Sequence, residues 1–356
     1  MKKLLSALLV LSMLLMGLTA FAEEGTYELA LVTDVGNIDD QSFNQSSWEG
    51  VVEFAEANNI SYAYYRPTED STNARVESIK TAIEKGAKTI VCPGYLFEEA
   101  IYLVQDEYSD VNFLLLDGEP HDASYSDYKT AANTHNILYQ EEQAGYFAGY
   151  AAVKDGYTKL GFMGGMAVPA VIRYGYGFVQ GADAAAAEMG VEIDIKYWYC
   201  GAFLPSDDFK VKMSGWYTDG TEIVFACGGS IYLNAVAAAE EAGAKVIGVD
   251  VDQYYVSDTV VTSAMKELKH SVILALTDLY ANDLVWPEAY SGTTAKLGVN
   301  DNCVGLPTDE TSWRFNTYTV EEYQELFAKV VSGEVVVSDD IAAEPAVTNS
   351  TVDYQE

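Results

Sequence analysis

The chain has 356 residues, 49% of them hydrophobic, and its 54 acidic and 20 basic residues give a net charge of −34. A surface this acidic repels nucleic acid and anionic membranes, which excludes both as partners. The hydrophobic content excludes a disordered acidic tail, and the length exceeds what one hydrophobic core usually holds, so two domains are predicted.

Residues 1–22 have the pattern of a secretory signal peptide. Two lysines at positions 2 and 3 precede an apolar run over residues 4–18, and Ala20-Phe21-Ala22 forms a small-x-small cleavage site. The apolar run is shorter than the ~20 residues that a membrane span requires. We therefore expect an exported protein in the periplasm or at the cell surface, with no lipid anchor at the cleavage site because no cysteine lies there.

Beyond this segment, short β-rich runs alternate with longer amphipathic runs. Strands are predicted at 26–34, 60–66, 88–93 and 111–117, and helices at 48–58, 73–85 and 98–107. Apolar strands that alternate with helices indicate a parallel sheet covered on both faces. The segment TAANTHN (130–136) is interpreted as a bridge to a second unit of the same kind.

The second unit repeats this rhythm. Helices are predicted at 140–153, 171–189, 207–216, 232–242, 268–282 and 320–331, and strands at 159–165, 191–199, 222–229 and 245–252, with further short strands after Asp258. Residues 85–101 and 218–236 share one plan of polar turn, apolar strand, glycine-containing turn and helix, which favours two similar lobes over one large sheet.

We therefore predict an α/β protein of two doubly wound parallel-sheet lobes joined by a hinge. Residues 23–133 plus about 255–300 are assigned to the N-terminal lobe, and residues 134–254 plus about 301–356 to the C-terminal lobe.

Four acidic residues, Asp34, Asp117, Asp250 and Asp252, lie where strands of the two lobes are predicted to end. Ligands of doubly wound folds bind beyond the carboxyl ends of the strands. Acids at equivalent positions in two lobes are therefore expected to line one cleft.

The segment TDVGNIDDQSFNQSSWEG (33–50) gathers polar groups at a strand-to-helix junction. Gly36 permits a turn there, and Asn37 tolerates the left-handed conformation that such turns often need. Asp39, Asp40 or Ser42 is expected to cap the helix that follows.

Phe43, in the same segment, is expected to lie at the cleft beside Asp34, Ser42 and Asn44. A ring flanked by polar side chains suits a flat heterocycle, because the ring stacks on its face while the polar groups hydrogen-bond to its edge. Packing in the core is the alternative for Phe43.

The four cysteines, Cys92, Cys200, Cys227 and Cys303, are far apart and form no C-x-x-C pair, and the three histidines share no ligand spacing. Buried free thiols are favoured over a disulfide. No metal and no cofactor are predicted.

The segment 33–50 closely resembles the start of the basic membrane protein family of solute receptors, which includes purine nucleoside receptors of ABC transporters and follows approximately TDxGGxDDxSFNQxxxEG. The resemblance covers nearly all of the chain after the signal peptide, through YSDVNFLLLDG (108–118), EEQAGYFAGYAA (141–152), KLGFMGGMAVPAVIRYGYGFVQG (159–181), FACGG (225–229), VIGVDVDQ (246–253) and TSAMK (262–266). It implies a type I periplasmic-binding-protein fold, a nucleoside-like and purine-containing ligand between two lobes, and delivery to a membrane permease.

The resemblance also implies which residues contact the base. Phe43 matches a ring that stacks on one face of the base, and Phe203 matches a second ring that closes from the other lobe, although YCGAFLPSDD differs from the usual GSFxDP around it. Asp34 and Asn44 match polar contacts to the base.

Further matches concern the sugar and the cleft wall. Asp117 and Asp252 match acids that contact sugar or base, with Asp250 as the rival to Asp252, and Lys266 matches a basic cleft residue. Carboxylates suit vicinal hydroxyls because charge-assisted hydrogen bonds are stronger than neutral ones. Gly229 is a candidate backbone contact.

The sequence departs from the family pattern at two places in the lobes. Asn37 replaces a usual glycine, and GGSIYLNA (228–235) lacks the usual glycine-rich GGTGNG run, so that the bulkier Tyr232 is expected to reshape the pocket.

The expected mechanism is capture by hinge closure, in a monomer and without catalysis. A nucleoside-hydrolysing enzyme is the alternative from another class, but no clustered aspartate loop, Ser/His/Asp arrangement or GxSxG motif supports it. Within the receptor class, riboflavin or a sugar-like ligand is the alternative, and a regulator on the same fold is disfavoured by the signal peptide.

Overall fold

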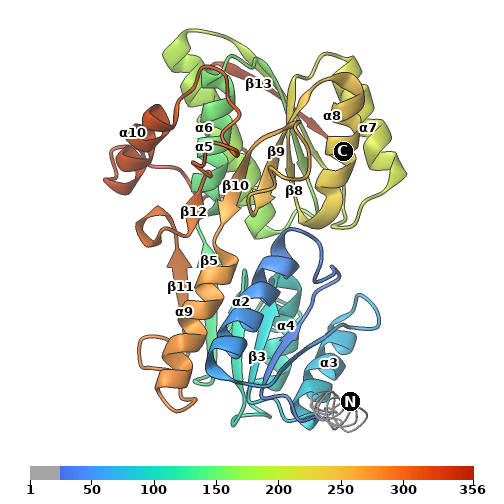
Figure 1. Ribbon diagram of the computed structural model, residues 1–356, viewed down its shortest axis with the longest axis vertical. Coiled ribbons are helices and arrows are strands. Elements are labelled where there is room, and N and C mark those ends of the chain that lie inside the picture. The colour runs from blue at the N-terminus through green and yellow to red at the C-terminus, as the bar shows by residue number, and fades with distance from the viewer. Residues whose placement is uncertain (1–24) are drawn as a thin grey trace, which may run out of the picture.

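The computed structural model describes residues 25–356, so the predicted signal peptide lies outside the described residues. Two α/β lobes lie one above the other, each built around one sheet with helices on its faces (Figure 1). The predicted two-lobed α/β architecture is confirmed.

The N-terminal lobe contains a six-stranded parallel sheet in the order β11-β5-β4-β3-β1-β2. Its strands are β1 (Leu29–Val32), β2 (Tyr62–Tyr65), β3 (Thr89–Pro93), β4 (Asn112–Leu116), β5 (Thr134–Tyr139) and β11 (Thr293–Leu297). Its helices are α2 (Phe43–Asn58), α3 (Thr72–Glu84), η1 (Tyr95–Phe97), α4 (Glu98–Val104) and α9 (Leu268–Ala281). Strands β1, β3 and β4 are buried along their whole length, as expected of a sheet covered on both faces.

The C-terminal lobe contains a seven-stranded sheet in the order β12-β10-β9-β8-β6-β7-β13, in which only the β10–β12 pair is antiparallel. Its strands are β6 (Lys159–Gly164), β7 (Ile193–Tyr199), β8 (Ile223–Cys227), β9 (Lys245–Asp250), β10 (Val260–Lys266), β12 (Val304–Gly305) and β13 (Ser350–Gln355). Its helices are α5 (Glu141–Lys154), α6 (Pro169–Met189), α7 (Asp207–Thr218), η2 (Gly229–Ile231), α8 (Tyr232–Ala242), η3 (Val299–Asp301) and α10 (Val320–Val331).

The chain passes between the lobes three times, and two passages differ from the predicted boundaries. Strand β5 belongs to the N-terminal sheet although residues from 134 on were assigned to the other lobe, and β10 belongs to the C-terminal sheet. The passages therefore lie at 139–141, 266–268 and 297–299. Strand β5 escaped prediction because it begins with three polar residues, Thr134, His135 and Asn136, which the fold buries.

Helices α5 and α6 pack so closely that only glycine fits between them. A Cβ on Gly145 would lie 2.1 Å from the carbonyl oxygen of Tyr174, and one on Gly181 would lie 1.9 Å from that of Tyr146. This contact fixes the first half of α5 against the middle of α6, so the two helices pack as one unit (Figure 1).

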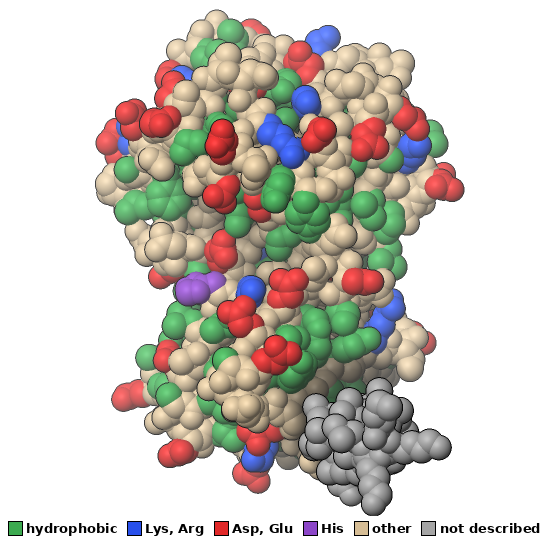
Figure 2. Space-filling model, in the orientation of Figure 1, with side chains coloured by type: hydrophobic (Ala, Val, Ile, Leu, Met, Phe, Trp, Pro, Cys, Tyr) green, Lys and Arg blue, Asp and Glu red, His purple; other side chains and the backbone are tan. Residues whose placement is uncertain are grey.

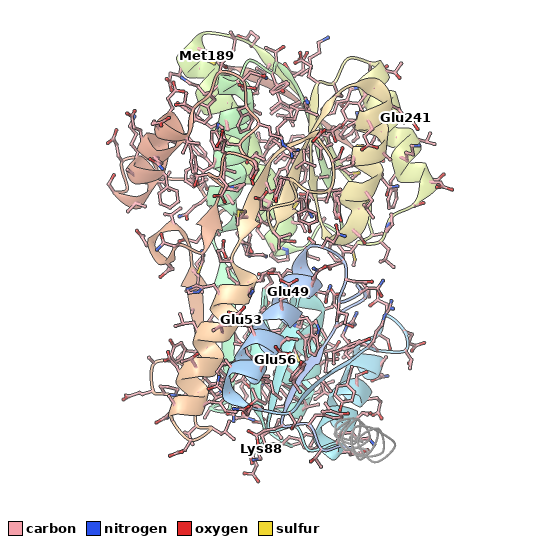
Figure 3. All side chains as sticks on the ribbon, in the orientation of Figure 1. Glu49, Glu53, Glu56, Lys88, Met189 and Glu241 are labelled. Carbon is pink, nitrogen blue, oxygen red and sulfur yellow. The ribbon has the colours of Figure 1, made fainter. Side chains whose placement is uncertain are left out.

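Helix α2 begins at Phe43, five residues before the predicted start at Trp48, and β13 was not predicted at all. The exposed face of helix α2 carries Glu49, Glu53 and Glu56 (Figure 3). Acidic side chains are scattered over the visible face of both lobes (Figure 2), in keeping with the net charge of −34.

All four cysteines are free, and Cys92, Cys227 and Cys303 are buried, which confirms the expected thiols. Within residues 25–356, no helix combines the length and the hydropathy that crossing a bilayer requires.

Candidate functional site

A cavity lies between the two lobes, at the carboxyl ends of their strands. The N-terminal lobe contributes Asp34, Gly36, Asp40, Phe43, Asn44, Gly94, Tyr95, Leu96 and Asp117; the C-terminal lobe contributes Val168, Ala170, Val171, Tyr174, Phe203, Cys227, Gly228, Gly229, Ser230, Val249, Asp250 and Lys266. Its mixture of apolar walls with a few polar groups is typical of a small-molecule site.

The segment after β1 is organised by Asp40. Its carboxylate accepts hydrogen bonds from the backbone N–H groups of Ser42 (2.9 Å), Asn44 (3.0 Å) and Gln45 (3.0 Å), and so caps the start of α2. Of the three predicted caps, Asp40 fills the role, whereas Asp39 is exposed. The left-handed residue of this turn is Gln41, with φ 54°, and not Asn37.

Asp34 and Asn44 form a buried pair on the cavity wall. Asp34 Oδ1 accepts from the backbone N–H of Gly36 (2.6 Å) and from Asn44 Nδ2 (2.9 Å), and Asn44 Nδ2 also donates to Asp40 Oδ2 (3.1 Å). Both amide protons of Asn44 are thus used, and its amide oxygen Oδ1, an acceptor, is buried without a partner. Burial raises the pKa of Asp34 to about 6, against the lowering effect of its two hydrogen bonds.

Two phenylalanine rings line the cavity from opposite lobes. Phe43 is the first residue of α2, and Phe203 lies in the loop after β7. The ring of Phe203 rests against glycine backbone, because a Cβ on Gly165 would lie 2.5 Å from its Cδ1 and one on Gly228 would lie 3.0 Å from it. The structure thus brings both predicted rings to one cavity.

Lys266, the last residue of β10, is the basic side chain among the residues that line the cavity. Its Nζ donates to Asp117 Oδ2 (2.5 Å) and Glu141 Oε1 (3.2 Å), and Glu141 Oε2 accepts from Arg173 Nε (2.6 Å). The Nζ also lies 4.9 Å from the centroid of the Phe43 ring.

The ionisation of this network follows from burial and charge. Burial by itself lowers the pKa of Lys266, but Asp117, Glu141 and Asp250 together raise it above its usual value, so the amine stays protonated. Burial raises the pKa of Asp117 to about 7, against the opposing effect of Lys266. The carboxyl Oδ1 of Asp117 is buried and has no hydrogen-bond partner.

Asp250, not Asp252, lies at the cavity. Asp117 and Asp250 occupy matching strand ends in the two lobes, and both have left-handed backbone, with φ 60° and φ 64°. The expectation that Asp252 contacts the ligand is not supported, because its carboxylate lies outside the cavity and accepts hydrogen bonds from Ser312 Oγ and from the backbone N–H of Tyr254. Two residues beyond the strand end, the chain has already turned away from the cleft.

Of the remaining predicted residues, Gly229 lines the cavity and Ser42 does not. The backbone of Gly229 has φ 52°. The Oγ of Ser42 donates to Asp250 Oδ2 across the cleft (2.5 Å). Sequence reasoning missed Tyr174, one turn after Pro169 at the start of α6; a helix-initiating proline after the strand-end glycines was the available signal.

Further hydrogen bonds join the lobes outside the cavity lining. Tyr232 OH donates to Gln41 Oε1 (3.1 Å), and Gln253 Nε2 donates to the carbonyl oxygen of Gln41 (2.9 Å). Tyr232 therefore does not reshape the pocket, as was expected from its bulk; it lies outside the cavity lining and connects the lobes.

We expect Tyr232→Phe to weaken binding of every ligand by about fivefold, because the closed form loses one neutral hydrogen bond. Calorimetry on several ligands checks this, and solution scattering should show a more open ligand-free protein. Tyr217→Phe is the control, since Tyr217 OH bonds to the carbonyl oxygen of Lys245 within one lobe (3.0 Å). A loss confined to one ligand would contradict a role in closure.

Comparisons with known proteins agree with this geometry. A family model described as "ABC transporter substrate-binding protein PnrA-like" matches residues 27–340. The chain belongs to this family, Bmp. It is therefore a solute-binding protein of an ABC transporter, a class that acts outside the cytoplasm and passes small molecules to a membrane permease.

Relatives fit the Bmp family, and a solved structure shares the fold. Basic membrane protein A of Borreliella afzelii is 28% identical over 319 residues, covering 88% of this chain and 92% of the relative. The "ABC transporter nucleoside-binding protein BmpA" of Lactococcus lactis subsp. cremoris is 28% identical over 262 residues, covering 67% and 71%. A solute-binding protein from Aeropyrum pernix K1 superposes with a TM-score of 0.73 at 21% identity, covering 88% and 94%, which supports the periplasmic-binding-protein fold.

Proposed function

We propose that this protein captures a purine nucleoside between its lobes, with a preference for 6-oxopurines such as guanosine and inosine, and presents it to a permease for import. The observation that carries the proposal is the pair of unused acceptors beside Phe43. Asp34 Oδ2 has no hydrogen-bond partner among the described residues, and Asn44 Oδ1 is buried without one.

Two adjacent acceptors favour an edge that presents two donors. Guanine offers N1–H and the 2-amino group, and hypoxanthine offers N1–H, whereas adenine offers an unprotonated N1 that would face an acceptor. The base would lie between Phe43 and Phe203, and each stacked face contributes ~1–3 kcal/mol where bases stack on aromatic rings.

The other wall of the cavity suits a sugar. Asp117 and Asp250 present carboxyl oxygens, and Lys266 supplies a donor next to them. Carboxylates discriminate strongly, because an analogue that lacks the hydroxyl leaves a buried polar group unpaired. The relative from Lactococcus lactis, named for nucleoside binding, supports the same ligand class.

The test is calorimetry of the purified chain from residue 23 against guanosine, inosine, adenosine, uridine, riboflavin and ribose. Guanosine and inosine are expected to bind most tightly, and Phe43→Ala should weaken them by at least tenfold through lost stacking. Tyr64→Ala, which removes a 48% exposed ring from the same lobe, should leave affinity unchanged. Tightest binding of riboflavin or ribose would overturn the nucleoside assignment, and release of free base would indicate the hydrolase instead.

The proposal has three further parts. The signal peptide directs export, the mature protein carries no lipid at the cleavage site, and the protein is a monomer. Mass spectrometry of secreted protein, with an N-terminus at Glu23 and no added lipid, tests the first two points.

A further inference from the structure

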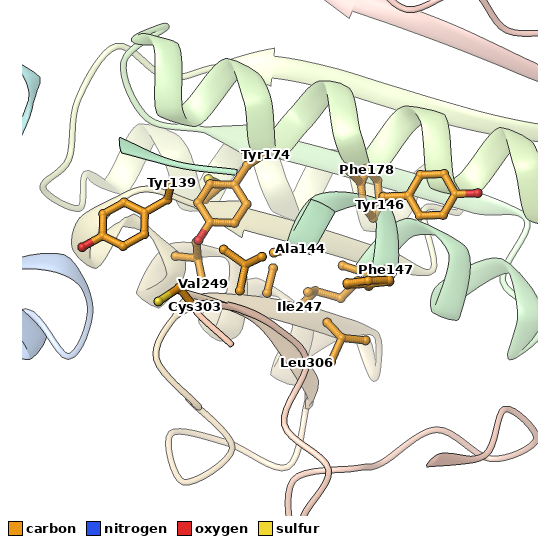
Figure 4. Close-up of a cluster of buried hydrophobic side chains, with 14 of the residues drawn as sticks. Tyr139, Ala144, Tyr146, Phe147, Tyr174, Phe178, Ile247, Val249, Cys303 and Leu306 are labelled. Carbon is orange, nitrogen blue, oxygen red and sulfur yellow. The ribbon is translucent and has the colours of Figure 1, made fainter. Parts of the chain in front are cut away.

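Tyr174 carries a buried hydroxyl that the described protein leaves unsatisfied. The residue is 2% exposed, lines the cavity and has no hydrogen-bond partner for its OH. Tyr139 lies at the same end of the buried cluster (Figure 4), but its hydroxyl is hydrogen-bonded to Ser271. A buried hydroxyl without a partner costs stability relative to phenylalanine, and Tyr174 differs from the other unpaired tyrosines, Tyr280, Tyr318 and Tyr354, in lining the cavity, where a ligand can supply the partner.

A second unsatisfied atom belongs to the same part of the cavity. Asp117 Oδ2 is bonded to Lys266 Nζ (2.5 Å), and the same Nζ lies 5.6 Å from the centroid of the Tyr174 ring. Asp117 Oδ1 is left without a partner. Lys266 thus lies next to both Asp117, from the N-terminal lobe, and Tyr174, from the C-terminal lobe, so the residues that carry the two unpaired oxygens line the same cavity from opposite lobes.

We infer that Tyr174 is a specificity-determining residue that donates a hydrogen bond to one sugar hydroxyl of the ligand, while that hydroxyl donates to Asp117 Oδ1. A hydroxyl is suited to this position because one atom accepts from the phenol and donates to the carboxyl group. A phosphate has no such match, since its charge would face that of the carboxylate. This inference rests on the proposed function and adds the recognition of one hydroxyl to it.

The experiment is a double-mutant cycle in which one change removes the tyrosine hydroxyl from the protein and the other removes one hydroxyl from the ligand. Wild type and Tyr174→Phe are titrated with guanosine and with its 2′-deoxy, 3′-deoxy and 5′-deoxy analogues. We expect Tyr174→Phe to bind guanosine about five- to tenfold more weakly, and to lose almost nothing for the one analogue that lacks the recognised hydroxyl. The melting temperature of the ligand-free variant should be unchanged or raised, because an unpaired buried group has been removed.

Tyr197→Phe is the matched control, because Tyr197 is 1% exposed and its OH is bonded to Tyr199 OH (2.6 Å), away from the cavity lining. It should lower the melting temperature and leave the ratios between the four ligands unchanged. Equal losses of Tyr174→Phe for guanosine and all three analogues would overturn the inference and leave the proposed function standing. A wild-type protein that binds no nucleoside would overturn both.

Discussion

Replacing Lys266 with methionine is expected to lower the free energy of unfolding by about 3–5 kcal/mol, the cost of removing one partner from a buried ion pair. Lys266 is 2% exposed and is bonded to two carboxylates, Asp117 and Glu141, that are themselves buried. Methionine fills a similar volume but leaves Asp117 without its charge partner. Urea unfolding of both proteins, followed by circular dichroism, measures the difference.

The pH dependence of this deficit gives it a specific signature. Without Lys266, the folded-state pKa of Asp117 should rise further above its unfolded value, so the folded variant takes up a proton as the pH falls. The deficit should therefore be largest near pH 8 and shrink toward pH 5. Lys269→Met is the control, because Lys269 pairs with Glu53 (2.7 Å) on the surface, where such pairs contribute about 0–1 kcal/mol. Equal effects of the two substitutions would contradict the buried network.

Asp34→Asn is expected to weaken guanosine binding by about 10- to 100-fold with little change in stability. The substitution replaces a charged acceptor at the base edge by an amide, and hydrogen bonds to charged groups contribute about 1.5–3 kcal/mol. The amide oxygen can still accept from the backbone N–H of Gly36 and from Asn44, so the turn is retained. Calorimetry measures the affinity, and Asp39→Asn, at an exposed neighbour, is the control. Guanosine binding that survives Asp34→Asn would remove the basis for the 6-oxopurine preference.

The same pair of proteins predicts how affinity depends on pH. Burial raises the pKa of Asp34 to about 6 in the ligand-free protein, with smaller effects from Asp40, which raises it, and Arg75, which lowers it. The ionised carboxylate is the acceptor for N1–H, so below pH 6 the part of the affinity due to Asp34 should fall about tenfold per pH unit. Other acids of the cavity titrate in both proteins. The wild type should therefore show a steeper loss than Asp34→Asn between pH 6 and pH 4.5, and parallel profiles would contradict this role.

Part of the candidate site could be predicted because it is local. Asp34, Phe43 and Asn44 lie within one stretch of eleven residues, at a strand-to-helix junction. The turn and cap residues of this junction can be recognised from their residue types. The alternation of apolar strands and amphipathic helices likewise predicted most elements within a few residues, because burial of a sheet on both faces imposes that pattern. Two helices, α8 and α10, have the predicted bounds.

Other features depend on contacts between distant segments. The partners of Lys266, Asp117 and Glu141, lie 149 and 125 residues away in the sequence, and no local sequence pattern predicts this pairing. Whether Asp250 or Asp252 lies at the cavity depends on where β9 ends and the chain turns. The sequence does not show this position, because the two acids are only two residues apart. Strand β13 pairs in parallel with β7, more than 150 residues earlier, and only two apolar residues, Val352 and Tyr354, alternate with polar ones in its short sequence.

By itself, the sequence determined the fold class, the two-lobed plan and the group of residues around Phe43, because helix caps, turns and apolar periodicity act between near neighbours. Only the tertiary structure decided which lobe β5 and β10 join, that Tyr232 connects the lobes, and that Tyr174 and Asp117, each with an unpaired oxygen, line one cavity. The physical reason is that each contact between the lobes joins residues that are far apart in the sequence. A short segment contains only one of the two partners, so its sequence cannot show the contact.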